Sequence, residues 1–554
     1  MKTKNKLELN WIGKYERKKV EPRILVEDKE KSYGEVDSGN LLIHGDNLLA
    51  LKSLEQEYSG KIKCIYIDPP FNTGAAFEHY DDNLEHSIWI NLMYKRLIIL
   101  HKLLKDDGVL LIEIDDNEMP YLRVLLDEIF GRNKFVAQIC VKSNNISGTK
   151  TANKEKTILR NKDNIIVYKK SDSLKVTPQY IERTRWDTHY NTYIIFDDNG
   201  NVKSMEKLKD ILIENGIIAN NESIKEGLLQ DTAFYKFILK NKKNICRLVN
   251  SIPKDLKELS HNNPNKIVKL EDENGNIRYA YNESRVSFLE SSIKEINGEE
   301  KFVQLLGDLW TDIDFQNTQN EGGVSFPASK KPEALIKRIL DLFTDDGDYI
   351  LDSFLGSGTT CAVAQKINRK WIGIEQGDHI YSHCIPRINN VIDGKDTSGI
   401  SKYYQYNAGG GYRFYELAPS LLNKDKYDNW VISSEYDADM LAEAMAKHNG
   451  FRYIKNQEVF FKQGYSTEKD FIFTTTNYID SQYLDMIYEL LGNDETLLIC
   501  CKSYDEECEF KYKNISIQKI PQSIIKKYEF GDVNYTLNIE DEIIEDGEEF
   551  EENE

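Results

Sequence analysis

The fold is decided by one continuous stretch, YILDSFLGSGTTCAVAQKINRKWIGIE at residues 349–375. Its two apolar ends are typical of β-strands, and the segment between them is typical of a helix. A strand, a glycine turn, a helix and a second strand form a βαβ unit, which implies a parallel sheet. Gly356 and Gly358 let the backbone approach a ligand closely, and the helix start offers free N–H groups. We therefore expect a ligand site on this loop.

The same alternation of strands and helices occurs earlier in the chain. Strands are expected at 41–43, 64–67, 109–114, 135–141 and 165–168, with helices at about 85–105 and 117–130 between them. A further helix, KPEALIKRILDLF at 331–343, precedes the quoted stretch. Two such blocks predict an α/β fold with a Rossmann-like, largely parallel sheet.

A second signal is the tetrapeptide Asp68-Pro69-Pro70-Phe71, which ends the expected strand at 64–67. Ligands of open parallel sheets bind outside the carboxyl ends of the strands. The Asp68 carboxylate and the Pro69 carbonyl could accept both N–H groups of an aromatic amine and direct the nitrogen lone pair at a methyl donor. Phe71 could stack on a base that has left the duplex. The alternative is an ordinary turn, because proline pairs often interrupt regular structure.

Glu375 ends the strand KWIGIE after the glycine loop. An acid at this position suits the two hydroxyls of an adenosine ribose. A generic dinucleotide site is the alternative, but the third glycine of the GxGxxG pattern is replaced by Cys361. That replacement argues against a nicotinamide cofactor.

Taken together, these motifs resemble the β-class amino-methyltransferases, and most closely the modification subunits of type III restriction systems. In that family the DPPY/F tetrapeptide precedes an FxGxG cofactor loop, and the target-recognition region lies between them. The matching motifs are HGDN (44–47), DPPF (68–71), NLMYKRL (91–97), DDGVLLIEIDDNE (106–118), NIIVYKK (164–170), KPEALIKRIL (331–340) and FLGSG (354–358). The resemblance covers about 40–170 and 308–392.

The resemblance implies S-adenosylmethionine as cofactor and a flipped adenine as methyl acceptor. It assigns the tetrapeptide Asp68, Pro69, Pro70 and Phe71 to the adenine. It assigns Asp352, Phe354, Gly356, Gly358 and Thr359 to the methionine end of the cofactor, Glu375 to its ribose, and Asp46 and Lys331 to the surrounding pocket. An aspartate at the first position of the tetrapeptide favours adenine over cytosine by family habit.

The expected domains follow the order of these motifs. We predict an N-terminal extension at 1–40, the catalytic half of the methyltransferase core at 41–170 and the cofactor half at 311–395. Between them we expect a target-recognition domain at 171–310, rich in Lys, Asn, Tyr and short broken helices. A small α/β domain at 396–539 and a disordered acidic tail at 540–554 complete the chain.

Charge is distributed unevenly, although the formal net charge of the chain is −20. Residues 540–554 alone hold ten carboxylates, whereas 236–269 hold nine Lys or Arg against two acids. A DNA backbone responds to local potential, because salt screens more distant charges. We therefore expect DNA contacts in the basic stretch, with Lys240, Lys242 and Lys243 as the candidates.

Three functions stay open at this point. The first is an adenine-specific DNA methyltransferase that serves as the modification and specificity subunit of a type III system, acting on double-stranded DNA as a homodimer beside a separate helicase–nuclease subunit. The second is a stand-alone methyltransferase, and the third is a catalytically silent DNA-recognition subunit. No apolar run spans a membrane and no metal-ligand spacing occurs, so we expect a cytoplasmic protein without a metal. A Glu113–Asp115 metal pair is the less favoured alternative to a cleft border.

Overall fold

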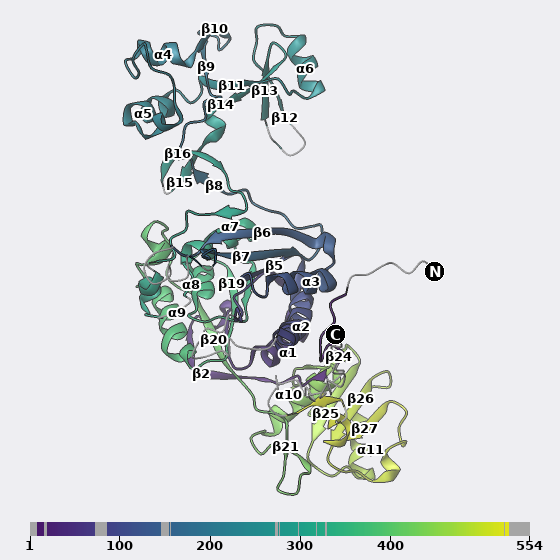
Figure 1. Ribbon diagram of the computed structural model, residues 1–554. Coiled ribbons are helices and arrows are strands. Elements are labelled where there is room, and N and C mark those ends of the chain that lie inside the picture. Colours follow the sequence, from purple (N-terminus) through teal and green to yellow (C-terminus); the bar gives the residue numbers. More distant parts are fainter. Residues whose placement is uncertain are drawn as a thin grey trace, which may run out of the picture. The chain divides into compact units, whose positions relative to one another are not determined.

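The computed structural model describes residues 8–15, 19–72, 86–145, 155, 157–271, 275, 277–296, 298–316, 318–326, 330–525 and 527–530. The chain divides into two compact units (Figure 1). Unit 1 comprises Met1–Thr177 and Asp308–Glu554, and unit 2 comprises Pro178–Gly307.

Unit 1 is built around a large mixed sheet. In the described part of the chain it has ten strands, in the order β17 (Leu309–Trp310), β6 (Phe135–Lys142), β7 (Lys162–Lys169), β5 (Leu104–Ile114), β4 (Ile62–Ile67), β18 (Tyr349–Asp352), β19 (Lys370–Glu375), β3 (Leu41–His44), β20 (Gly411–Leu417) and β2 (Leu25–Gly34). From β5 to β20 every neighbouring pair is parallel. The pairs β5–β7, β6–β7 and β2–β20 are antiparallel. This parallel centre confirms the predicted Rossmann-like α/β fold.

Helices cover the sheet in two groups, one on each side (Figure 1). One group is α1 (Asn47–Tyr58), α2 (His86–Leu103) and α3 (Met119–Phe130); the other is α7 (Glu333–Phe343), α8 (Thr359–Lys366) and α9 (Ile385–Ile392). Strands between two helical layers are buried on both faces and read as continuous apolar runs. Strand β4, IKCIYI, is buried at all six positions.

The two halves of the predicted core interleave within this sheet. Strands β18 and β19, from the second half, lie between β4 and β3 from the first half. The strand that ends in Asp68 is therefore the direct neighbour of the strand that ends in Asp352. In open α/β sheets, ligands bind in the crevice where the strand order changes in this way.

The large sheet extends beyond the limits expected from sequence. Strand β2 lies within the predicted N-terminal extension, and β20 lies beyond the predicted end of the core at 395, yet the two pair at one edge of this sheet. The limits expected from sequence follow the alternation of strands and helices. An antiparallel edge pair takes no part in that alternation.

Unit 2 contains a six-stranded sheet and a three-stranded sheet among its described residues, and each neighbouring pair is antiparallel. The six strands are β10 (Val202–Lys207), β9 (Thr192–Phe196), β11 (Ile245–Val249), β14 (Ser284–Phe288), β13 (Ile277–Tyr281) and β12 (Val268–Glu271). The three are β15 (Ile293–Ile296), β16 (Glu299–Leu305) and β8 (Tyr180–Glu182), and the helices are α4 (Leu208–Glu214), α5 (Thr232–Lys240) and α6 (Lys254–His261). Trp186, Phe234 and Phe302 pack together in its core. The expectation of short broken helices missed these sheets.

The C-terminal part of unit 1 has its own five-stranded sheet among the described residues. Its strands are β23 (Arg452–Tyr453), β24 (Gly464–Thr467), β25 (Asp470–Thr475), β26 (Thr496–Cys501) and β27 (Ile515–Lys519), with helices α10 (Ala438–Asn449) and α11 (Ser481–Leu490). Here α11 joins the parallel strands β25 and β26. Short strands β1 (Lys19–Val20) and β28 (Tyr528–Glu529) pair with each other, as do β21 (Leu422–Lys424) and β22 (Trp430–Ile432). The predicted acidic tail lies outside the described residues. Within the described ranges no helix is both long and apolar enough to cross a membrane.

Candidate active site

Polar side chains end five adjacent parallel strands at one edge of the large sheet. They are Glu113 on β5, Asp352 on β18, Glu375 on β19 and His44 on β3, together with Asp68 directly after β4. The register places Glu375 directly opposite His44, and Asp352 opposite Gly373. The carboxyl ends of parallel strands meet at the same edge, so both sequence motifs contribute to one site.

The tetrapeptide after β4 is held by a buried tryptophan. The Trp89 indole N–H, from α2, donates to the Pro70 carbonyl oxygen over 2.8 Å, and the Trp89 side chain is fully buried. No hydrogen bond to the Pro69 carbonyl occurs among the described residues. Phe71 is half-buried and packs against the main hydrophobic core. As far as the described residues go, the Pro69 carbonyl therefore keeps accepting capacity for a ligand.

Asp68 is largely buried and only partly paired. Its Oδ2 lies 3.2 Å from the Lys331 Nζ, whereas its buried Oδ1 has no hydrogen-bond partner among the described residues. Burial and the nearby Glu113 carboxylate raise the pKa of Asp68, and Lys331 opposes this rise; the resulting pKa is about 8. An open acceptor oxygen on such a carboxylate can receive an N–H group from a ligand.

Lys331 bridges two carboxylates. Its Nζ donates to Glu113 Oε1 over 2.7 Å and also lies 5.0 Å from the centre of the Phe71 ring. Glu113 is fully buried, and its Oε2 accepts from the Tyr66 hydroxyl over 2.5 Å. Both oxygens of Glu113 therefore have partners within the chain, which argues against the metal alternative at Glu113–Asp115.

The glycine loop after β18 is closed by two carboxylates. Asp352 accepts from the Phe354 N–H (3.0 Å) and from the Thr360 hydroxyl (2.6 Å), and burial raises its pKa to about 7. Glu375 accepts from the Gly356 N–H at Oε2 (2.7 Å) and from Gly377 at Oε1 (2.8 Å). The loop is thus preformed by its own chain.

The two glycines of the loop differ in what surrounds them. Gly356 has a φ of +56°, and a Cβ added there would meet nothing within 4 Å. Gly358 has a φ of +82°, and its Cβ would lie 3.3 Å from the Cα of Cys384. Gly356 therefore faces open space where a ligand can lie, whereas Gly358 allows close packing of the loop against the segment before α9.

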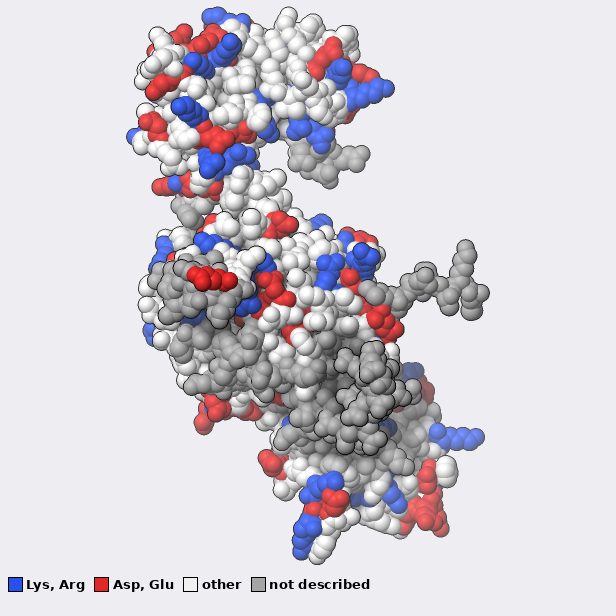
Figure 2. Space-filling view, viewed as in Figure 1, with Lys and Arg blue, Asp and Glu red and all other residues white. Residues whose placement is uncertain are grey.

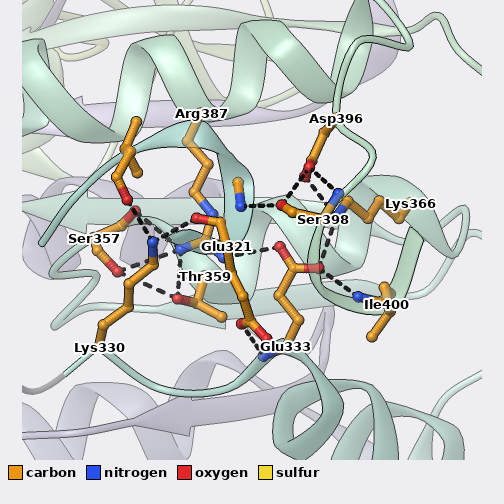
Figure 3. Close-up of polar contacts among 12 residues, drawn as sticks. Glu321, Lys330, Glu333, Ser357, Thr359, Lys366, Arg387, Asp396, Ser398 and Ile400 are labelled. Carbon is orange, nitrogen blue, oxygen red and sulfur yellow. Dashed lines mark hydrogen bonds and ion pairs between the residues drawn. The ribbon is translucent and has the colours of Figure 1, made fainter. Parts of the chain in front are cut away.

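A buried ionic network supports the loop from below (Figure 3). Arg387, on α9, donates to the Thr359 hydroxyl over 2.7 Å and to Glu333 Oε1 over 2.8 Å. Glu333 also pairs with Lys366 over 2.6 Å. Lys366 in turn pairs with Asp396 over 2.7 Å. Thr359 therefore contacts protein groups here, and its hydroxyl holds the loop against α9.

The same network fixes the segment that carries Lys331. Neighbouring Lys330 donates to the carbonyls of Gln319 (3.2 Å), Val324 (2.7 Å) and Glu321. The Glu333 N–H donates to Glu321 Oε2 over 2.9 Å (Figure 3). Lys330 thus anchors the backbone, and Lys331 reaches the Asp68 carboxylate from a fixed position.

Two residues missed by the sequence interpretation connect α1 to the loop. Asn47 donates to the Ser353 carbonyl over 2.7 Å, and Arg96 donates to Asn47 Oδ1 over 2.6 Å. Asp46, predicted to line the cofactor pocket, accepts from the Leu49 N–H and caps α1. Asn47 belongs to the HGDN motif and Arg96 to the NLMYKRL motif, and these two motifs are the sequence signals for them.

Three further residues were not predicted as part of the site. Arg387 stood in a helix without any motif, and Glu113 was interpreted as a cleft border. Glu118, in the DDNE motif, is fully buried; it accepts from Asn72 (2.6 Å) and pairs with His86 (2.8 Å). Its only sequence signal was the acidic run before α3.

The lysines predicted to contact DNA lie in unit 2, around the end of α5. Lys242 pairs with Glu300, and Lys243 lies 3.8 Å from Glu290. Lys240 is exposed and has no acidic partner among the described residues. On the face of unit 2 seen in Figure 2, basic and acidic side chains are interspersed. Only Lys240 therefore offers an unshared charge.

Comparison with known proteins gives a consistent family. A family model described as DNA methylase matches residues 62–385. The chain is 36% identical to the HindVI Mod subunit of Haemophilus influenzae, named as a probable type III restriction-modification enzyme, over 69% of this chain and 54% of that one. It is 27% identical to the StyLTI type III Mod subunit of Salmonella typhimurium, over 63% and 52%. The chain thus spans about half the length of these two relatives.

Solved structures of DNA methyltransferases are also similar. The cytosine-N4-specific PvuII DNA methyltransferase is 15% identical, with a TM-score of 0.32, over 67% of this chain and 90% of that one. The complex of M1.HpyAVI with S-adenosylmethionine is 15% identical, with a TM-score of 0.29, over 63% and 99%. Both TM-scores are low, so the fold assignment rests on the sheet topology.

Proposed function

The chain belongs to the DNA methylase family, whose model matches more than half of it, and from this premise we propose that it is an adenine-specific DNA methyltransferase. It transfers a methyl group from S-adenosylmethionine to the N6 amino group of an adenine in double-stranded DNA. One observation carries the proposal: the two motifs lie side by side. Asp68, with its open acceptor oxygen, follows one strand, and the preformed glycine loop follows the neighbouring parallel strand.

The loop fits the methyl donor. The open space at Gly356 is a cradle that an added Cβ would fill. Gly358 caps the start of α8, and the first N–H groups of a helix have no partner within the helix. Phe354 is buried in the main hydrophobic core behind the loop. Glu375 holds the Gly356 and Gly377 N–H groups, and its remaining lone pairs lie at the strand end that suits ribose hydroxyls. When bound, S-adenosylmethionine supplies a methyl group on a positively charged sulfur.

The tetrapeptide then holds the acceptor. Asp68 Oδ1 and the Pro69 carbonyl accept the two amino hydrogens, which keeps the nitrogen lone pair directed at the methyl carbon. Phe71 stacks on the extruded base. The new bond forms between the nitrogen and the methyl carbon, the sulfur–carbon bond breaks, and the surplus proton passes to Asp68, whose raised pKa suits a proton acceptor.

The choice of adenine rests on Asp68 as the first residue of the tetrapeptide. The family is described as DNA methylase, which does not specify the base. The relatives named as type III Mod subunits favour the adenine assignment for this chain.

We further propose that the chain serves as the modification and specificity subunit of a type III restriction-modification system, as a homodimer in the cytoplasm with a separate restriction subunit. The two curated relatives are named as type III Mod subunits, which supports the assignment to a restriction-modification system. Unit 2, which interrupts the methyltransferase core, would read the DNA sequence, because a long insertion with its own core and surface has a task of its own.

Sequencing of single DNA molecules from a methylation-free host that expresses the chain tests the proposal. We expect N6-methyladenine at one sequence context, and none from the same host with the Asp68→Ala variant. Methylcytosine or an unmodified genome would contradict it. Exchanging residues 178–307 for the matching segment of a relative should change the context and leave the chemistry intact.

A further inference from the structure

The ammonium group of Lys331 is shared unequally between two carboxylates. It lies 2.7 Å from Glu113 Oε1 and 3.2 Å from Asp68 Oδ2. Glu113 cannot turn away, because its other oxygen accepts from the Tyr66 hydroxyl and the residue is fully buried. The Lys331 ammonium therefore makes its shorter contact with Glu113, which is fixed, and its longer contact with Asp68, which must meet the target amine.

This arrangement leaves one oxygen of Asp68 open. If Lys331 were not held by Glu113, its three N–H donors could approach Asp68 Oδ1 as well. A loosely held Lys331 would thus compete with the target amine for the acceptor oxygen.

We propose that Glu113 is a positioning residue of the methyl-transfer site: it holds the Lys331 ammonium against Asp68 Oδ2, where the ammonium favours the ionised carboxylate, and off Oδ1. Lys331 then acts electrostatically on the Asp68 carboxylate, in addition to any contact that it makes with the methyl donor. The catalytic part of this inference rests on the proposed function. The effect of Lys331 and Glu113 on the charge of Asp68 does not depend on that function.

The charges around Asp68 give the two residues opposite effects. Lys331 lowers the pKa of Asp68, while Glu113 and Asp163, on β7, raise it. Tyr66 donates to Glu113 and carries no charge at neutral pH, since its surroundings raise its pKa well above the usual value. Removing an opposite charge within a few ångströms shifts a carboxyl pKa upward by about 1–3 units.

The first test measures methyl transfer in single turnover against pH, at saturating S-adenosylmethionine. The wild-type rate should rise with a midpoint near 8, because Asp68 must be ionised to accept hydrogen bonds. Lys331→Met should move the midpoint up by about 1–3 units, and Glu113→Gln should move it down and lower the limiting rate. The double variant should return toward the wild-type midpoint, because both opposing charges are gone.

A matched control comes from the other end of the same sheet. Lys63, on β4, is also buried and pairs with Asp107 over 2.8 Å, but it precedes Asp68 by five strand positions, roughly 16 Å. Lys63→Met removes a buried, paired lysine without touching Asp68. Its pH midpoint should equal that of the wild type.

The second test needs no activity, so it separates this inference from the proposed function. Thermal unfolding is followed from about pH 5 to about pH 10 for each background, with Asp68 present and with Asp68→Asn. The native pKa of Asp68 is raised above its unfolded value, so its contribution to stability falls as pH rises and becomes constant above the native pKa. In each background, the quantity compared is the difference in stability between the protein with Asp68 and the protein with Asn at that position. The pH at which this stability difference becomes constant reports the native pKa of Asp68.

The levelling pH should be near 8 in the wild type, higher with Lys331→Met and lower with Glu113→Gln. Equal levelling pH in all three backgrounds would overturn the inference. So would a Lys331→Met variant that loses only S-adenosylmethionine affinity, measured by calorimetry, and keeps its pH midpoint. If the wild type transfers no methyl group but the levelling pH still shifts in the two variants, only the proposed function is contradicted.

Discussion

Two aspartates end neighbouring parallel strands of the large sheet, and their surroundings differ. Asp352, on β18, has both oxygens engaged, by the Phe354 N–H and the Thr360 hydroxyl. Asp68, after β4, shares one oxygen with Lys331 and leaves the other without a partner among the described residues. Burial raises the pKa of both. Burial alone therefore does not distinguish the carboxylate that we propose to react from the one that holds the loop; the open acceptor oxygen does.

The largest effect should come from Asp68→Ala. Loss of an acceptor that acts in the transition state should lower the methyl-transfer rate by at least about 100-fold, as measured with purified protein and duplex DNA. Calorimetry should find S-adenosylmethionine affinity unchanged, because Asp68 holds the amine and not the donor. Asp107→Ala, at the opposite end of the sheet, is the control. A rate within tenfold of wild type, on the order of 1.4 kcal/mol, would place the acceptor elsewhere.

Gly356→Val should act at the glycine loop, which Asp352 holds in place, and should weaken binding of the methyl donor. The added side chain would project into the open space of the loop, and the φ of +56° is unfavourable for valine. We expect S-adenosylmethionine affinity to fall by at least about tenfold in calorimetry, or about 1.4 kcal/mol. Gly60→Val has a similar φ of +69° and equally open surroundings, away from the site, and controls for backbone strain. Equal affinity for wild type and Gly356→Val would remove the loop from the donor site.

Asp352→Asn should lower stability more than chemistry. Asn offers a single accepting oxygen, so either Thr360 or the Phe354 N–H would lose its acceptor, at a cost of about 1–3 kcal/mol in the free energy of unfolding. The native pKa of Asp352 is raised to about 7, so its contribution is largest at low pH and is lost as pH rises toward 7. Denaturant unfolding should therefore show a loss that shrinks between about pH 4 and pH 7. A loss that grows with pH would contradict this assignment.

The smallest effect should come from the lysines of unit 2. Replacing Lys240, Lys242 and Lys243 by Gln should weaken DNA binding and reduce the salt dependence by about one phosphate contact, since two of the three already have acidic neighbours. A matched triple change at Lys402, Lys424 and Lys426, in unit 1, controls for net charge. Equal salt slopes for both triple variants would move the DNA contacts away from α5.

The core could be predicted from sequence because its signals are local. The DPPF and FLGSG motifs each lie at the end of an apolar run, and a run buried on both faces is unambiguous, as in β4. The edge pair of β2 and β20 could not be predicted. Its partners are far apart in the chain, and β2 (LVEDKEKSYG) is mostly polar.

The strands of unit 2 were missed for a related reason. Strand β12, VKLE, is only four residues long, so its apolar–polar alternation covers too few positions to distinguish a strand from a loop. Within the site, Glu113 and Lys331 were each visible as polar residues beside apolar runs. Their contact joins residues 218 positions apart, and no spacing rule within one sequence indicates such a pair.

The central claim is that Asp68 directs an adenine amino group at the methyl donor. Mass spectrometry of nucleosides from duplex DNA, after incubation with the purified chain and S-adenosylmethionine, tests it most directly. The account predicts N6-methyladenine as the methylated nucleoside, and none with the Asp68→Ala variant under the same conditions. N4-methylcytosine from the wild type, or N6-methyladenine from the variant in comparable amount, would contradict it.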